Sequence, residues 1–171
     1  MTRFMGRWYE VVKDKYNYYE LTSGCTIADY NLNEDGSVAV HNSGEDYFKG
    51  WGDIHGKAVT SNVTGPGSLV VEFFSEPDPN QPGNYNVLGT DYDNYVIVYN
   101  CDQKFHGTFA YDTLGILARD VTLSDEKLAE AQAIIAEKIP DYHYNASTKM
   151  TKQGDVCDYS KIPQGSSIIL Q

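Results

Sequence analysis

The stretch CTIADYNLNEDGSVAVHNSG, residues 25–44, contains the pattern that decides the fold. Two strand-like runs, residues 25–33 and 37–44, flank the dipeptide Asp35-Gly36. Asp-Gly is typical of a tight β-hairpin because both residues tolerate positive φ. The stretch therefore predicts an antiparallel pair of strands, and the same kind of run recurs on both sides of it.

Six further strand-like runs accompany this hairpin and are joined by short connections. They cover residues 7–16, 46–58, 68–74, 84–90, 94–101 and 108–118. Glycines within residues 46–58 indicate bulges or a close approach of backbones. Eight such strands are most simply arranged as an up-and-down antiparallel β-barrel, because closure removes the sheet edges. The predicted fold class is therefore all-β.

One amphipathic helix is predicted after the last strand. Its apolar residues recur at spacings of three and four, which favour a helix: Leu128, Ala131, Ile135 and Ile139. Ser124 or Thr122 can cap its start, and Pro140 ends it. We expect this helix to pack outside the barrel.

Composition restricts the possible partners. The chain has 171 residues and a formal net charge of -11, a size that suits one domain. An acidic chain does not favour a nucleic-acid groove or docking on anionic lipid. No run of 18 or more apolar residues exists, so membrane insertion is not expected. Residues 1–4 show no leader-like stretch, so we expect either a cytosolic chain or a mature form.

Motifs for catalysis are missing from the sequence. It contains no HExxH, CxxC or GxGxxG pattern, and no Ser-His-Asp order with supporting glycines. We therefore predict no catalytic residue, no metal site and no required cofactor, and we expect a protein that is not an enzyme.

Three patches together resemble the signature regions of the lipocalins: Gly6-Arg7-Trp8-Tyr9-Glu10, Thr90-Asp91-Tyr92 and Ile116-Leu117-Ala118-Arg119. They occur in the family's order, on eight strands followed by a helix. Residues 25–30, 45–48 and 94–101 are most similar to the apolipoprotein D-like and insect bilin-carrying branches of that family. The resemblance implies a lipocalin domain over residues 4–158 and a C-terminal tail over residues 159–171.

The signature residues are expected to be structural. Trp8 is a ring large enough to plug the floor of a barrel, and Arg119 can lie across it as a cation–π partner. Asp91 is expected to accept loop hydrogen bonds and not to act as an acid catalyst.

The three cysteines are assigned through the resemblance. It implies that Cys25 pairs with Cys157. In relatives, Cys101 pairs with a cysteine before the first strand, and this sequence has no such cysteine, so Cys101 is expected to be unpaired. The sequence is then either an N-terminally truncated or a divergent member of the family, or Cys101 acts as a thiol nucleophile. A disulfide implies an oxidising compartment, hence a secreted, extracellular protein. Asn62 and Asn145 begin glycosylation sequons.

The inner wall follows from the alternation of side chains along strands. The residues predicted to line it are Thr26, Ala28, Tyr30, Val38, Val40, Asn42, Leu69, Val71, Phe73, Tyr85, Val87, Ile97, Tyr99, Phe109, Tyr111, Thr113 and Gly115. These residues either fill a solid core or surround a cavity, and the resemblance favours a cavity. Relatives carry Trp at the position of Gly115, so glycine either opens room for a larger ligand or admits a neighbouring ring. Tyr16, Tyr18 and Tyr19 either cap a flat ligand at the open end or form ordinary loop surface.

The resemblance implies a secreted carrier of one hydrophobic small molecule. A bound chromophore is expected, with biliverdin first and a carotenoid second, and fatty acids and steroids follow. One alternative is an isomerase that depends on Cys101, and another is a haem binder with an axial ligand from His41, His55, His106 or His143. The sequence leaves homo-oligomerisation open.

Overall fold

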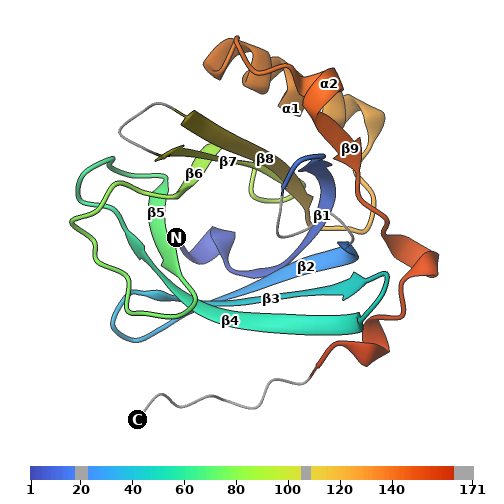
Figure 1. The fold of residues 1–171 in the computed structure, drawn as a ribbon, viewed down its shortest axis with the longest axis horizontal. Coiled ribbons are helices and arrows are strands. Elements are labelled where there is room, and N and C mark those ends of the chain that lie inside the picture. Colours follow the sequence, from blue (N-terminus) through green and yellow to red (C-terminus); the bar gives the residue numbers. More distant parts are fainter. Residues whose placement is uncertain (18–22, 105–108, 164–171) are drawn as a thin grey trace.

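The computed structural model describes residues 1–17, 23–104 and 109–163, and its strands close into a barrel (Figure 1). Consecutive strands pair from β2 to β8, and β1 pairs with both β8 and β2, which completes the ring. This confirms the eight-stranded up-and-down antiparallel barrel. The barrel strands are β1 (Gly6–Asp14), β2 (Ser23–Leu32), β3 (Val38–Asp46), β4 (Gly50–Thr60), β5 (Ser68–Glu72), β6 (Tyr85–Thr90), β7 (Tyr95–Lys104) and β8 (Phe109–Ala118).

The predicted hairpin joins β2 to β3. Gly36 takes a φ of 82°, a conformation that favours glycine because it has no Cβ. The Asp35 carboxylate accepts a hydrogen bond from the backbone N–H of Ser37 at 2.9 Å. The two strands then pair in register from Leu32 opposite Val38, so the Asp-Gly turn sets which residues share each face.

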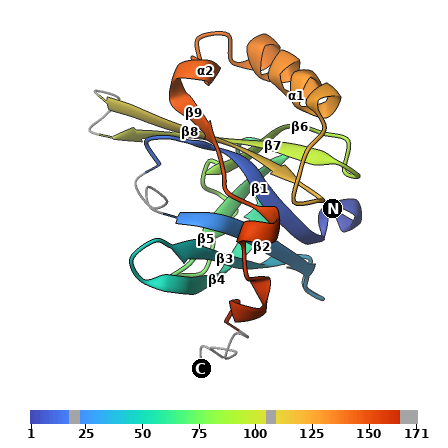
Figure 2. The same ribbon diagram turned by 90° about the vertical axis from the view of Figure 1, so that its right-hand side faces the viewer.

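Helix α1 (Asp125–Lys138) lies outside the barrel, over β6 and β7 (Figure 2). The Ser124 side chain caps it by accepting from the backbone N–H of Lys127 at 3.3 Å. Ala131 and Ile135 are buried against the outer side of the wall, which is the face that the sequence pattern predicts. Among the described residues, no helix is long and apolar enough to cross a membrane.

Two short elements after α1 were not predicted: α2 (Tyr144–Ser147) and β9 (Thr148–Met150). β9 extends the sheet by pairing antiparallel with residues 12–14 of β1. The Tyr142 hydroxyl donates to Asp14 Oδ2 at 2.7 Å and ties this region to the same strand. Elements of three or four residues carry too little periodicity to be predicted, and their place is set by contact with β1.

Residues 151–162 form a C-terminal segment that crosses the outside of β1 and β2 (Figure 2). Cys157 in this segment is disulfide-bonded to Cys25 in β2, as the resemblance implies. The Gln153 side-chain amide donates to the carbonyl oxygens of Glu10 and Thr26 at 2.9 and 2.7 Å. The segment is therefore held to the barrel by one covalent bond and by hydrogen bonds to two strands.

The packed part of the chain continues past residue 158, where the tail was expected to begin. In η4 (Tyr159–Lys161), the Tyr159 ring lies 5.7 Å from the Tyr9 ring and 6.1 Å from the Trp51 ring. Ile162 is also buried. The beginning of the predicted tail thus packs on the barrel, because its apolar side chains cover outer-face aromatics, and residues 164–171 lie outside the described part.

Candidate ligand-binding site

An aromatic cluster closes one end of the barrel. Helix η1 (Thr2–Phe4) places the Phe4 ring 5.6 Å from the Trp8 ring and 5.5 Å from the Tyr30 ring. The Trp8 indole N–H donates to the Phe4 carbonyl oxygen at 2.8 Å. The hydroxyls of Tyr30 and Tyr85 lie 3.1 Å apart. These two tyrosines, which the sequence places on the inner wall, pack against the aromatic cluster of the floor. The sequence pattern did not indicate Phe4, because this residue precedes the first strand.

Arg119 fastens this floor. Its guanidinium carbon lies 3.6 Å from the centroid of the Trp8 ring, which is the predicted cation–π contact. The guanidinium also donates to the carbonyl oxygens of Arg3 and Arg7 at 2.7 and 3.0 Å. A further bond reaches the Tyr92 carbonyl oxygen at 3.1 Å. One side chain therefore joins η1, β1 and the β6–β7 loop across the closed end.

Asp91 organises the loop between β6 and β7. Its carboxylate accepts from the backbone N–H groups of Asn94 and Tyr95 at 2.8 and 3.1 Å. The Asn94 side chain donates at 2.7 Å, and Lys127 of α1 forms an ion pair at 3.2 Å. The residue thus has the geometry of a loop hydrogen-bond acceptor that also contacts the outer helix.

The pH dependence of stability should report on Asp91. Burial acts to raise the pKa of this carboxyl, but hydrogen bonds from Asn94, Tyr95 and Lys127 outweigh it and hold the pKa well below its usual range. A carboxyl whose pKa is lowered in the folded state stabilises the fold when the pH is above its pKa in the unfolded chain, about 3.9. This stabilisation is lost as the pH falls towards the pKa of the folded state. We expect Asp91→Asn to be less stable at neutral pH and to lose less further stability on acidification. Urea unfolding at neutral and acidic pH measures this, and parallel losses in both proteins would contradict it.

The inner wall is apolar. Predicted inward residues of β2, β3, β5 and β6, together with Phe73 directly after β5, lie in or against one interior cluster: Ala28, Tyr30, Val38, Val40, Leu69, Val71, Phe73, Tyr85 and Val87. Further members of the cluster were not predicted: Phe4, Ala58, Val96, Val98 and Leu117. Contact of these residues with a ligand stays a prediction, but their placement follows the alternation of side chains across the barrel wall.

The inward face of β7 is the opposite of the predicted one. Ile97 and Tyr99 pack in the cluster outside the barrel, beneath α1. Val96 and Val98 belong to the interior cluster instead. Because a helix covers the outside of β7, both faces of the strand are apolar and a two-residue period cannot distinguish them. The prediction that Ile97 and Tyr99 line the cavity is therefore wrong.

Three polar atoms on the inner wall are buried without a hydrogen-bond partner among the described residues. They are Thr26 Oγ1, Asn42 Oδ1 and Asn100 Oδ1. A buried polar atom left unpaired costs about 1–3 kcal/mol, so a water or a ligand is expected to satisfy these three. Thr26 and Asn42 were predicted to line the cavity, whereas Asn100 was missed because it shares the face of Val98.

Space is open beside Gly115 on β8. Gly115 pairs with Val98 and Thr113 pairs with Asn100, so both share the inward face, as predicted. A Cβ added at Gly115 would meet only the Val12 carbonyl oxygen, at 3.8 Å. Among the described residues, no ring lies within 4 Å of that position. Room for a larger ligand here stays a prediction.

A buried lysine at the same level was missed. Lys13 is the cross-strand partner of Gly115 and is almost fully buried. Its ammonium donates to the carbonyl oxygen and hydroxyl of Ser23 at 2.6 and 3.2 Å. Sequence reasoning assigns a strand lysine to solvent, and only the pairing of β1 with β8 reveals its position.

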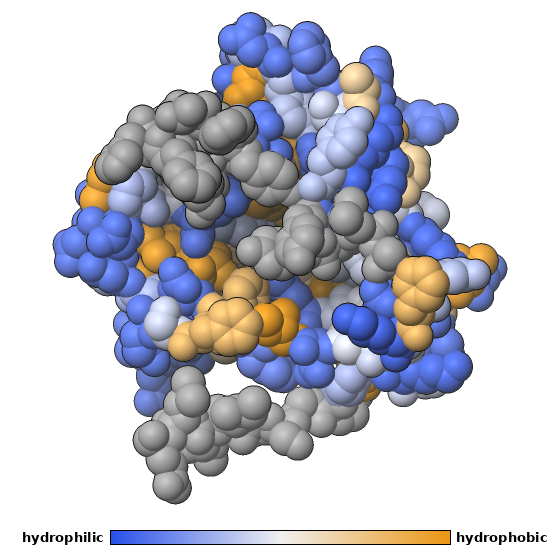
Figure 3. Space-filling view, viewed as in Figure 1, coloured by the Kyte–Doolittle hydropathy of each residue, from blue (hydrophilic) through white to orange (hydrophobic). Residues whose placement is uncertain are grey.

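Exposed aromatic side chains lie at the turns that follow β3 and β5. Tyr47 and Phe48 are strongly exposed, with rings 5.0 Å apart, and Phe74 is 90% exposed. In the space-filling view, hydrophobic surface lies in a recess bordered by hydrophilic side chains (Figure 3). An apolar recess with few polar groups is the usual form of a small-molecule site.

Comparison with known proteins is consistent with this geometry. A family model described as the lipocalin / cytosolic fatty-acid binding protein family matches residues 5–156. The chain belongs to the lipocalin family. It is 36% identical to apolipoprotein D of Cavia porcellus over 135 residues, which are 79% of this chain and 68% of that protein. It is 31% identical to the Lazarillo protein of Schistocerca americana, over 77% of this lipocalin and 60% of that protein.

Solved structures share the fold of this lipocalin. Lobster apocrustacyanin A1 superposes with a TM-score of 0.76 at 22% identity, covering 93% of this chain and 82% of that one. Insecticyanin of Manduca sexta gives 0.75 at 23% identity, covering 93% and 84%. At these identities the likeness concerns the barrel and its outer helix.

The histidines of this lipocalin lie away from the interior wherever they are described. His41 and His55 are cross-strand partners on the outer face of β3 and β4, and His143 is exposed before α2. The described histidines therefore give no axial ligand for haem inside the barrel.

Some predicted residues lie outside the described part of the structure. His106, Tyr18 and Tyr19 are among them, as are the side chains of Cys101, Phe109 and Tyr111. Tyr16 is described and is exposed.

Proposed function

We propose that this lipocalin is a carrier that binds one hydrophobic small molecule inside its barrel, with biliverdin as the first choice and a carotenoid as the second. The unpaired polar atoms of Thr26, Asn42 and Asn100 on an apolar wall carry this proposal. An apolar pocket supplies most of the binding free energy, and a few polar groups orient the ligand. The similarity of residues 25–30 and 94–101 to insect bilin carriers supports the choice of biliverdin.

The direct test is a titration of the purified protein with biliverdin. Binding in a rigid apolar site should shift and intensify the red absorption band, and the signal should saturate at one pigment per chain. A carotenoid such as astaxanthin, a fatty acid and a steroid are titrated in parallel. A response to one of these without a response to stoichiometric biliverdin would retain the carrier and replace its ligand, and no binding of any class would overturn the proposal.

Asn100→Leu should weaken ligand binding about tenfold, because it removes one inner polar group worth about 1.4 kcal/mol as a hydrogen bond to ligand. Asn31→Leu is the matched control, since it makes the same change at an exposed position of the barrel wall. Dissociation constants are measured for the ligand that responds in the titration. Equal constants for Asn100→Leu and the parent would show that the ligand does not use this amide.

We propose further that the protein is secreted and that it acts by binding a ligand and not by catalysis. The disulfide between Cys25 and Cys157 supports an oxidising compartment. Asn62, in the turn between β4 and β5, and Asn145, in α2, are both exposed and thus accessible to glycosylation.

A further inference from the structure

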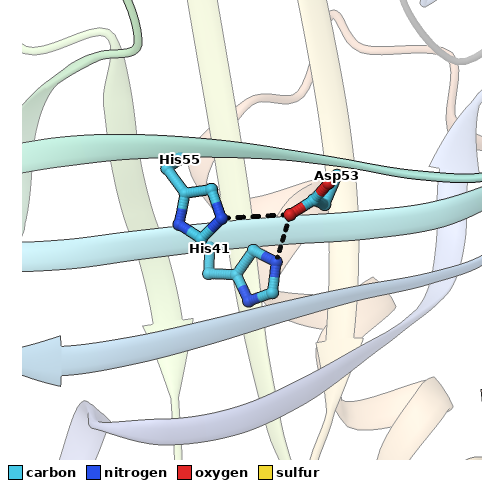
Figure 4. A group of neighbouring side chains, drawn as sticks. All are labelled: His41, Asp53 and His55. Atoms are coloured by element: carbon cyan, nitrogen blue, oxygen red, sulfur yellow. Dashed lines mark hydrogen bonds and ion pairs between the residues drawn. The ribbon is translucent and has the colours of Figure 1, made fainter. Parts of the chain in front are cut away.

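A compact group of two histidines and one aspartate lies on the outer face of the barrel, away from the interior (Figure 4). His41 on β3 is the cross-strand partner of His55 on β4, so both side chains lie on one face. Asp53 lies two residues before His55, which returns its carboxylate to the same face. The strand register therefore brings together two imidazoles and one carboxylate from residues 41–55, which span β3, the turn after it and the first half of β4.

The geometry aims both imidazoles at one point. The two rings are stacked, with centroids 4.2 Å apart and planes 5° from parallel. The Nε2 atoms of His41 and His55 each lie 3.0 Å from the same oxygen, Asp53 Oδ2. One potential ligand atom from each residue lies within 4.8 Å of the other two.

These distances fit chelation after small movements. Two ligand atoms bound to a tetrahedral zinc ion at about 2.0–2.1 Å lie about 3.3 Å from each other. The present separations of 3.0 Å between nitrogen and oxygen are close to that value. Each nitrogen–oxygen separation would have to lengthen by only about 0.3 Å to match it.

The chemistry of the group selects a class of ion. Imidazole nitrogen suits zinc, copper, nickel and cobalt, whereas calcium and magnesium prefer all-oxygen sites. Two neutral imidazoles and one carboxylate leave a divalent ion with one positive charge and an open position for water. The His41 and Asp53 side chains are 20% and 21% exposed and that of His55 is 42% exposed, so an ion can enter from solvent.

The neighbouring cationic side chains of the described residues are paired with carboxylates other than that of Asp53. Asp29, the partner of His41 on β2, is paired with Arg7 through two hydrogen bonds of 2.9 and 2.7 Å. Lys57 is paired with Asp35 and Glu76. Within the described residues, the ion pairs of Asp53 are therefore those with the two histidines.

We propose that His41, Asp53 and His55 form a binding site for a divalent transition-metal ion, with zinc as the first candidate, on the outer face of this lipocalin. The site is independent of the ligand in the barrel, because its residues lie on the opposite side of the wall. The structure supplies three side chains as ligands, and a tetrahedral ion would take its fourth ligand from water.

Titration of the apo protein with Zn²⁺ by isothermal calorimetry tests the proposal, and Co²⁺ absorption supplies a spectroscopic readout. We expect one ion per chain and a higher melting temperature with Zn²⁺, because an ion that binds only the folded state stabilises it. His41→Gln and His55→Gln should each weaken binding by more than about 100-fold, the upper end of the loss caused by removing a mere supporting partner. Asp53→Asn tests the carboxylate in the same way.

His143→Gln is the matched control, since it removes an exposed histidine elsewhere. It should leave both stoichiometry and affinity unchanged. Circular dichroism confirms that each variant is folded. Binding that survives in the His41→Gln, His55→Gln double variant, or a parent protein that binds Zn²⁺ no better than this variant, would overturn the proposal without affecting the proposed carrier function.

Discussion

Trp8→Ala should lower the free energy of unfolding by about 3–5 kcal/mol, the usual cost of deleting a large buried ring. The Trp8 side chain is fully buried between the Phe4 ring and the Arg119 guanidinium. Its removal leaves a cavity in the floor and also leaves the Phe4 carbonyl oxygen without its indole donor. Urea unfolding followed by far-ultraviolet circular dichroism measures the loss.

The second tryptophan of the chain provides a control for Trp8→Ala. Trp51 is only partly buried, and its indole N–H has no hydrogen-bond partner among the described residues. Trp51→Ala should therefore destabilise the protein much less. Trp8→Phe should recover part of the loss, because it refills some of the cavity. A loss below about 1 kcal/mol for Trp8→Ala would show that the floor does not depend on this ring.

The double variant Cys25→Ser, Cys157→Ser should lose about 2–5 kcal/mol of stability. The bond joins residues separated by 132 positions, and closing so long a loop restricts the unfolded chain strongly. It also holds residues 151–162 over β1 and β2, so their loss of anchorage should add to the effect. At about 2–4 °C per kcal/mol for a chain of this size, the melting temperature should fall by roughly 10 °C.

Reducing agent separates this effect from that of substitution. It should lower the melting temperature of the parent protein and of Cys101→Ser, which keeps the Cys25–Cys157 bond, and leave the double variant unchanged. If the double variant melts at the same temperature as the oxidised parent, the disulfide contributes no stability.

The structural core of the site was largely predictable from local chemistry. Gly36 and Asp35 specify the hairpin. Leu69 and Val71 in β5, with Phe73 directly after it, show the inward face through their alternation with Glu72. The pairing of Cys25 with Cys157 came from the family resemblance, and the contact of Trp8 with Arg119 came from a family signature together with cation–π chemistry. These features can be predicted without knowing which strands are neighbours, because each is indicated by a turn, by side-chain periodicity or by a recognised motif.

The polar part of the site could not be predicted in the same way. Asn100 shares the inward face of Val98. Because α1 covers the other face of β7, both faces of that strand are apolar, and their alternation does not show which of them meets the interior. Lys13 is buried through its pairing beside Gly115. Neither fact follows from alternation along a single strand.

By itself, the sequence determined the eight barrel strands, the β2–β3 hairpin turn and the outer helix, because turn chemistry and side-chain periodicity act over only a few residues. Only the tertiary structure decided which face of β7 meets the interior and which distant groups meet across strands. It also brought His41, Asp53 and His55 to one point. The physical reason is that register and closure of the barrel join residues far apart in the chain, and no local pattern encodes what lies on the neighbouring strand.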